Sequence, residues 1–134
     1  MPLIQWNNDL YSVKIESIDK HHQTLISLIN QLHEAMREGN AKEIMDGILH
    51  ELNDYTIYHF NAEEDLMRSH NYPMEEYTFH KEQHEEFKFK LSELVEKYQN
   101  EEILISIETS KFLKEWLVNH IQKVDKKIAG IINY

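Results

Sequence analysis

The chain has 134 residues, of which 41% are hydrophobic and 28% charged, as expected of one compact globular domain. It carries 24 acidic against 14 basic residues, a formal charge of -10 that disfavours binding to nucleic acid or anionic lipid. The absence of cysteine excludes disulfides, iron–sulfur clusters and thiol catalysis, while only three glycines and two prolines favour long helices.

No export signal is visible at the amino terminus. Its first residues, MPLIQWNNDLYS, have neither the basic region nor the apolar run of a signal peptide. No stretch of the chain approaches the roughly 18 apolar residues that a transmembrane helix needs. We therefore expect a cytoplasmic protein without membrane insertion.

The chain reads as a single domain, 1–134, that begins with an arm over about residues 1–18 and continues as helices over about 19–131. The arm lacks a helical repeat. The first helix is predicted to start near Asp19, a plausible N-cap residue, and to stop at 38–40. Further helices are expected at about 42–68, 74–98 and 103–131, with Pro73 interrupting the second and third.

Each predicted helix carries one apolar stripe at a spacing of three and four residues. Representative members of these stripes are Leu25, Leu28, Leu32, Ile48, Leu52, Phe87, Leu91, Leu113, Leu117 and Ile121. Four long amphipathic helices with short connections predict an all-α fold, an antiparallel up-down-up-down four-helix bundle with an N-terminal arm. The charged outer faces lead us to expect a monomer.

Seven residues that can bind metals fall on these inner stripes. They are His22, His59, Glu63, His80, His84, His120 and Asp125. His59 and Glu63 are four residues apart, as are His80 and His84, so each pair shares one helix face. The sequence therefore predicts that four helices direct five imidazoles and two carboxylates toward one level of the bundle.

This set of side chains favours a transition-metal site. Imidazole with carboxylate suits iron, manganese or zinc rather than magnesium or calcium, and seven ligands suit two ions that share bridges. The alternative is that these are ordinary core residues, since a single histidine on an apolar stripe is more often structural. Two buried carboxylates without partners would cost several kcal/mol each, which favours the metal site.

The remaining polar residues near the stripes are predicted to lie at the surface. They are Glu64 and the histidines His21, His33, His50 and His70. His120 and Asp125 are five residues apart, which fits one α-helical face imperfectly, so either a longer reach of the side chain or a local distortion of the fourth helix is expected there.

Four motifs give the chain a family resemblance over essentially its whole length. They are Ile18-Asp19-Lys20-His21-His22, His59-Phe60-Asn61-Ala62-Glu63-Glu64, His80-Lys81-Glu82-Gln83-His84 and Trp116-Leu117-Val118-Asn119-His120, the last followed by Asp125. With these motifs the chain resembles the hemerythrins, specifically their single-domain bacterial form. All seven metal positions of the family pattern are filled in order.

The resemblance implies two non-heme iron ions with an oxo or hydroxo bridge. His80, His84 and His120 would hold one iron, His22 and His59 would hold the other, and the carboxylates of Glu63 and Asp125 would bridge them. The first iron would have six ligands and the second five. O2 would bind at the position left open on the second iron.

The function expected from this resemblance is reversible O2 binding, for oxygen storage, transport or delivery, without enzymatic turnover. The chain contains no Glu-x-x-His pair of the kind that carboxylate-rich di-iron proteins place on paired helices. Two alternatives remain open at this point: detoxification of peroxide or nitric oxide at the same open position, and sensing of oxygen or iron. Zinc or manganese could also occupy such ligands.

Overall fold

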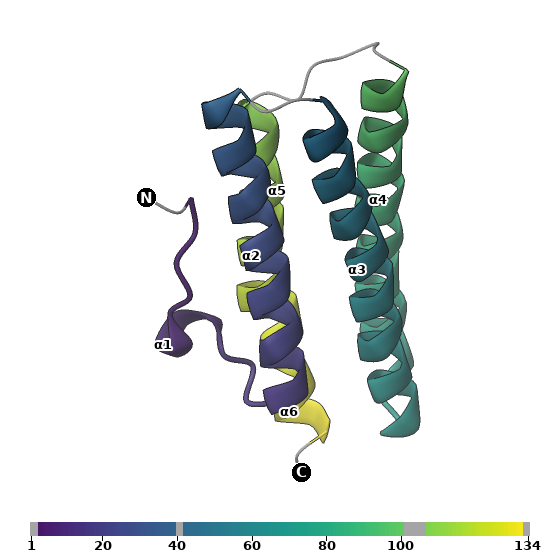
Figure 1. Ribbon diagram of the computed structural model, residues 1–134. Helices are drawn as coiled ribbons and strands as arrows, with labels where there is room; N and C mark the ends of the chain where they lie inside the picture. The colour runs from purple at the N-terminus through teal and green to yellow at the C-terminus, as the bar shows by residue number, and fades with distance from the viewer. Residues whose placement is uncertain (1–2, 40–41, 101–106, 133–134) are drawn as a thin grey trace.

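The computed structural model describes residues 3–39, 42–100 and 107–132, and most of this chain is helical (Figure 1). In chain order the elements are α1 (Asn8–Tyr11), α2 (Glu16–Glu38), α3 (Lys42–Ser69), α4 (Met74–Gln99), α5 (Ile107–His120), the π-helical turn η1 (Ile121–Asp125) and α6 (Lys126–Ile132). These described ranges contain no strand, so the predicted all-α class is confirmed.

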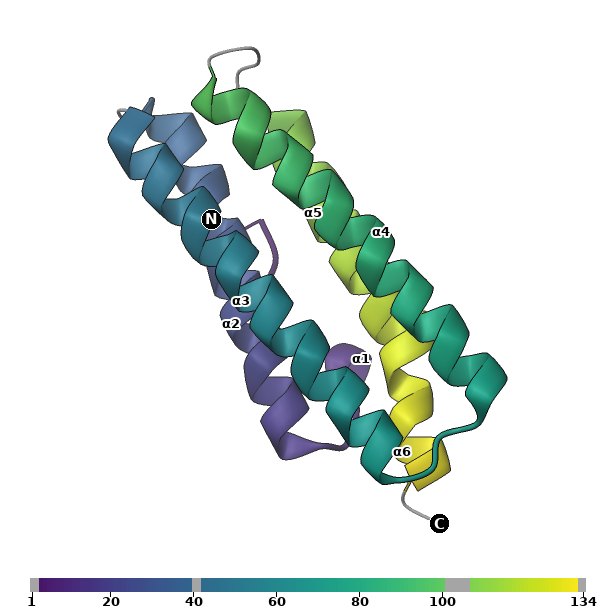
Figure 2. The ribbon, with the colours of Figure 1, turned by 90° about the vertical axis from the view of Figure 1, so that its right-hand side faces the viewer.

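The long helices form an antiparallel bundle. The chain runs alternately up and down through α2, α3, α4 and the continuous segment α5–η1–α6 (Figure 1). Helix α3 packs against α2 and α4, and α2 also packs against α5. Seen from the side of α3 and α4, α2 lies behind α3 and α5 behind α4 (Figure 2). The predicted up-down-up-down bundle is therefore confirmed, while the predicted start of its fourth helix, at 103, lies outside the described residues.

Two helix ends are set by backbone that leaves the α-helical region. Gly39 closes α2 in the left-handed conformation, with φ 67°, and its N–H donates to the carbonyls of Ala35 and Met36. Glycine adopts this conformation without the steric cost that a Cβ would add. Asn71, just after α3, also adopts the left-handed conformation, with φ 54°, and Pro73 then precedes α4. The predicted breaks at 38–40 and at Pro73 thus coincide with observed helix ends as far as residue 39.

The predicted N-cap role of Asp19 is wrong. Helix α2 begins at Glu16, three residues earlier, and Asp19 lies in its first turn. Its carboxylate instead accepts hydrogen bonds from the Ser12 hydroxyl at 2.6 Å and from the Val13 N–H at 2.8 Å. Asp19 therefore fastens the arm to the helix, and a negative charge near the helix N-terminus is also favourable for the helix dipole.

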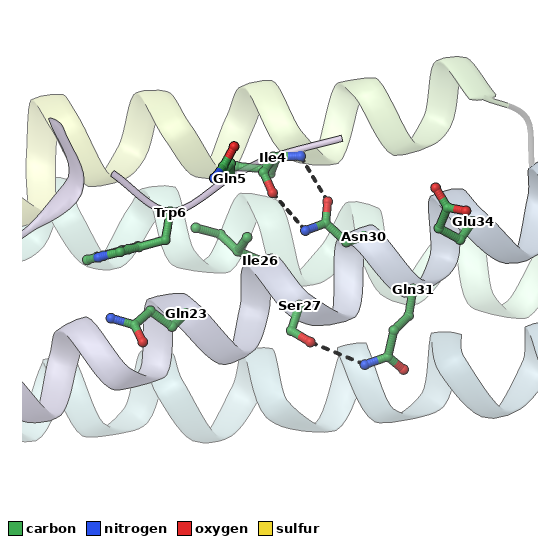
Figure 3. Close-up of a pocket in the computed structure, with 9 residues that line it drawn as sticks. All are labelled: Ile4, Gln5, Trp6, Gln23, Ile26, Ser27, Asn30, Gln31 and Glu34. Atoms are coloured by element: carbon green, nitrogen blue, oxygen red, sulfur yellow. Dashed lines mark hydrogen bonds between the residues drawn. The ribbon is translucent and has the colours of Figure 1, made fainter. Parts of the chain in front are cut away.

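The described part of the arm, from residue 3, includes a helix that the sequence did not predict. Helix α1 is one turn, capped by the Asn7 side chain, which accepts from the Leu10 N–H. Further back, the Asn30 side-chain amide pairs with both backbone groups of Ile4, at 2.9 Å and 2.8 Å (Figure 3). Between the arm and the outer face of α2 lies a cavity of about 510 Å³, lined by Trp6, by Ile26 and by several polar side chains.

The core follows the predicted stripes. Its largest fully buried side chains include Leu28, Ile29, Leu32, Leu49, Leu52, Phe60, Leu91, Leu113 and Ile121. They form one continuous cluster along the bundle. None of the helices in the described ranges combines the length and apolar character that a bilayer span requires.

Candidate metal centre

Seven polar side chains meet inside the bundle where a hydrophobic core would otherwise continue. They come from all four long segments: His22 from α2, His59 and Glu63 from α3, His80 and His84 from α4, His120 from the end of α5, and Asp125 from η1. Each is at most 3% exposed. The structure therefore brings together all seven residues that the sequence singled out.

Asp125 lies between two sets of histidines. Its Oδ2 is 3.0 Å from Nε2 of His22, while its Oδ1 is 2.8 Å from Nε2 of His80 and 3.0 Å from Nε2 of His120. The two oxygens thus face different imidazoles. A carboxylate arranged in this way can bridge two cations.

Glu63 makes a second connection between the same two sets. Its Oε1 lies 3.2 Å from Nε2 of both His59 and His84, and its Oε2 lies 3.9 Å from Nε2 of His22. Two groups of ligand atoms result, each with its atoms within 4.8 Å of one another. One joins Glu63, His80, His84, His120 and Asp125, and the other joins His22, His59, Glu63 and Asp125. The groups share both carboxylates, but the larger contains three histidines and the smaller contains two others.

The π-helical turn explains how Asp125 reaches the centre. Residues 121–125 form η1 between α5 and α6. Hydrogen bonds in a π-helix join residues five apart, so such residues lie nearly above one another, whereas an α-helix would rotate the fifth residue away. Of the two possibilities expected from the spacing of His120 and Asp125, a longer reach or a local distortion, the structure shows the distortion.

Several polar atoms of this centre have no hydrogen-bond partner among the described residues. They include both oxygens of Glu63, both oxygens of Asp125, Nε2 of His59 and both ring nitrogens of His22. Buried polar atoms are normally paired, and leaving one unpaired costs about 1–3 kcal/mol. The donor set of imidazole and carboxylate is the one that binds first-row transition metals, so these residues fit a metal site.

Burial and mutual contacts shift the titration of both carboxyl groups. Burial raises the pKa of Glu63 well above its usual range, and the adjacent Asp125 raises it further. Burial also acts to raise the pKa of Asp125, but His120 and the close imidazole nitrogens of His22 and His80 outweigh it and hold this pKa well below its usual range. At neutral pH one carboxylate of the pair is thus strongly favoured to be ionised.

Burial keeps three histidines of the centre, His59, His84 and His120, neutral. It lowers the pKa of His59 well below its usual value, with a further contribution from His22. It also lowers the pKa of His84 and of His120. Neutral imidazole is the form of histidine that binds metals, so these three side chains are in the competent state at neutral pH.

Three histidines of the centre contact a polar side chain through Nδ1, their outer ring nitrogen. Nδ1 of His84 lies 2.9 Å from Oε2 of Glu64, and Nδ1 of His120 lies 2.9 Å from Oε1 of Gln83. Nδ1 of His59 lies 3.0 Å from Nδ1 of His21. Such partners fix the tautomer and the orientation of an imidazole.

The surface positions predicted for three of the outer polar residues are wrong. Glu64 is only 5% exposed, because α4 covers it, and His33 is 8% exposed and pairs with Ser110 of α5 at 3.0 Å. His21 is half-buried between His59 and the rings of Tyr55 and Tyr58. The predictions of exposure for His50 and His70 are confirmed. Helical spacing alone gave no signal for these partners, because it does not specify which neighbouring helix covers a flank.

Aromatic rings pack against the remaining faces of two imidazoles. Phe60 stacks on His84 with ring centroids 3.8 Å apart and an angle of 5°, and Trp116 stacks on His120 at 4.6 Å and 12°. Trp116 also stacks on Phe87 of α4. These rings fix the imidazole planes and shield the centre from solvent on those sides.

The cavity under the arm is separate from this centre. It is lined by Gln23, Ile26, Ser27 and Asn30, which lie on the outer face of α2 (Figure 3). Another cavity, of about 370 Å³, lies between α4 and α5 and reaches His120 and Trp116. Of these two cavities among the described residues, the second contacts one of the seven, His120.

The comparisons with known proteins agree with the geometry. The model of the hemerythrin HHE cation binding domain matches residues 13–132. A bacteriohemerythrin of Methylococcus capsulatus is 32% identical over 129 residues, which cover 94% of both chains. A bacteriohemerythrin of Stenotrophomonas maltophilia is 36% identical over 132 residues, covering 96% of this chain and 81% of that protein.

Solved structures extend the similarity to three dimensions. A crystal structure of wild-type hemerythrin superposes with a TM-score of 0.92 at 29% identity, covering 98% of this chain and 99% of the other. A hemerythrin-like protein of Naegleria gruberi is 32% identical over 95% of this chain and 92% of its own length. The chain therefore belongs to the hemerythrin family, alongside the bacterial hemerythrins that its sequence motifs resemble.

Proposed function

We propose that the protein binds O2 reversibly at a di-iron centre. In this proposal His80, His84 and His120 hold one iron, His22 and His59 hold the other, and Glu63 with Asp125 bridges them. The observation that carries the proposal is the pair of ligand groups that share two carboxylates and differ by one histidine. If each ion is octahedral, the smaller group, with His22 and His59, would fill one coordination position fewer than the larger group.

The chemistry of this centre would come from the metal and the environment from the chain. Two ferrous ions would supply two electrons and one open coordination position to O2. The chain supplies neutral imidazoles and only two carboxylates to the centre, a less electron-donating set than the carboxylate-rich di-iron sites of helical bundles. This favours binding and release over oxidation of a substrate, and supports the absence of an enzymatic role.

The walls of the centre also fit an oxygen-binding role. Leu25 lies one turn from His22, and Leu117 and Ile121 flank His120; all three are at most 4% exposed. Apolar walls keep water and protons away from the reacting atoms. Release of the ligand would then leave no net oxidation of the metal.

The mixed charges on the outer faces, such as the pairs of Lys97 with Glu93 and Lys90 with Glu86, support a monomer. We propose a cytoplasmic monomer that stores or delivers O2. Size-exclusion chromatography with light scattering should give the mass of one chain.

The proposal is tested by loading the protein with ferrous iron without air and then adding O2. A visible absorption band should appear with O2 and disappear when O2 is removed, with two iron atoms per chain by elemental analysis. His59→Ala removes a ligand of the iron proposed to bind O2 and should abolish the band. His50→Ala, an exposed histidine on the same helix, is the matched control and should retain it.

Other outcomes would replace the proposal. Irreversible bleaching after O2 is added, or no band in fully loaded protein, would contradict reversible binding. Steady-state consumption of peroxide or nitric oxide that His59→Ala abolishes would indicate a detoxifying enzyme instead. Tight loading with zinc in preference to iron, established by elemental analysis of freshly isolated protein, would indicate a different metal.

A further inference from the structure

The histidines of the centre differ in the side chain that contacts Nδ1, their outer ring nitrogen. In the larger group, His84 faces a carboxylate, Glu64, and His120 faces an amide, Gln83. In the smaller group, His59 faces the imidazole of His21. Nδ1 of His22 and of His80 has no partner among the described residues. Of the five imidazoles, His84 is thus the one whose outer nitrogen contacts a carboxylate within the described chain.

Glu64 is held in place by the packing of α3 on α4. It is 5% exposed, although it neighbours Glu63 in the chain, because the side chains of α4 cover it. Burial raises the pKa of Glu64 from its usual value and the nearby Glu85 adds to this rise, whereas Lys88 and Lys81 of α4 and Arg68 of α3 act against it. Since a carboxylate can only accept a hydrogen bond, the Nδ1 that faces it carries the proton, and Nε2 of His84 keeps its lone pair for the centre.

We propose that Glu64 is a positioning residue whose negative charge, acting through His84, makes the three-histidine side of the centre the more electron-donating side. The proposal rests on the di-iron function described above and deepens it. A hydrogen bond to a carboxylate raises the basicity of an imidazole ligand. A more basic ligand stabilises ferric over ferrous iron, so Glu64 lowers the reduction potential of the centre and eases electron donation to O2.

A purely structural role for Glu64 makes a different prediction. If Glu64 only satisfies the buried N–H of His84, a neutral acceptor of the same shape serves equally well. Glutamine is such an acceptor, because its carbonyl oxygen can take the place of Oε2 without the charge. The substitution Glu64→Gln therefore separates the charge of the side chain from its hydrogen bond.

The test is a redox titration of the iron-loaded protein. Glu64→Gln should shift the ferric-to-ferrous equilibrium about tenfold or more toward ferrous, a rise of about 59 mV for a one-electron couple. Asp65→Asn is the matched control: it neutralises the exposed carboxylate next along α3, which pairs with Arg68, and should leave the potential unchanged. Proton–nitrogen correlation spectra of the metal-free protein should place the His84 proton on Nδ1 in both the wild type and Glu64→Gln.

A second variant guards against failure to fold, which circular dichroism would reveal. Glu64→Asp keeps the charge but withdraws it by one methylene, so its potential should fall between those of the wild type and Glu64→Gln. Equal potentials in the wild type and the Glu64 variants, with normal O2 binding, would overturn the inference and leave the proposed function intact. A shifted potential in a protein that never binds O2 would support the inference and refute the function.

Discussion

Glu63 should stabilise the metal-loaded protein and destabilise the metal-free one. Its side chain is fully buried, neither oxygen has a hydrogen-bond partner among the described residues, and burial raises its pKa. Leucine has a similar size and no polar atoms. Replacement of buried polar or ionic groups by packed apolar ones is often stabilising, so Glu63→Leu should raise the free energy of unfolding of the metal-free protein by about 1–3 kcal/mol.

Metal binding should reverse this order. A metal that binds only the folded state adds about 4 kcal/mol at a thousandfold excess over its dissociation constant. Glu63→Leu lacks one of the two carboxylates that connect the ligand groups and should lose most of that gain. In thermal unfolding, where 1 kcal/mol corresponds to about 4 °C for a chain of this size, the variant should melt above the wild type without metal and below it with ferrous iron.

Thr56→Val provides the control for this experiment. Thr56 lies two turns earlier on α3, is 1% exposed, and its hydroxyl has no partner among the described residues. Its substitution should also stabilise the metal-free protein but should leave the gain on metal binding unchanged. A loss of metal-free stability in Glu63→Leu, or a gain on metal binding equal to that of the wild type, would refute the reasoning.

Three further perturbations have expected results. The metal-free protein should lose stability as the pH falls from about 6.5 to about 5, because three histidines with lowered pKa bind protons in this range only once the chain unfolds. Glu63, with its raised pKa, keeps a proton in the folded state and offsets one of them, so the slope should approach about 2.7 kcal/mol per pH unit near pH 5, measured by denaturant titration. Asp19→Ala should lower the free energy of unfolding by about 1.5–3 kcal/mol, because it removes the carboxylate that accepts hydrogen bonds from the arm. It should also increase amide exchange at Val13 without changing the metal content. Phe60→Ala should lower the free energy of unfolding, measured in urea, by about 3–5 kcal/mol, because it leaves a cavity beside His84. Each argument has a contradicting result: stability that does not change with pH, amide exchange at Val13 that is unchanged in Asp19→Ala, or a loss of stability below about 1 kcal/mol in Phe60→Ala.

The inward set could be predicted because its pattern repeats along each helix. The spacing of His59 with Glu63, and of His80 with His84, defines a face from local geometry alone. The five-residue step from His120 to Asp125 predicted a longer reach or a local distortion, and the structure has the distortion, η1. Periodicity thus carries the information needed to choose residues that share a level of the bundle.

The flanks of the stripes could not be predicted in the same way. Helix α3 packs against both α2 and α4, so its buried arc is wider than one apolar stripe, and Glu64 falls within that arc. His33 is buried for the same reason between α2 and α5. Helix α1 is a single turn stabilised by one cap, too short for any repeat to be visible. Each of these features depends on a tertiary neighbour rather than on local spacing.

The unequal ligand sets are the central claim, and a crystal structure of the iron-loaded protein with azide tests them most directly. Azide is a small anion that occupies open coordination positions on ferric iron. Anomalous diffraction should locate two iron atoms that share Glu63 and Asp125, with azide only on the iron held by His22 and His59. A single metal ion, or azide on the iron held by three histidines, would contradict the account.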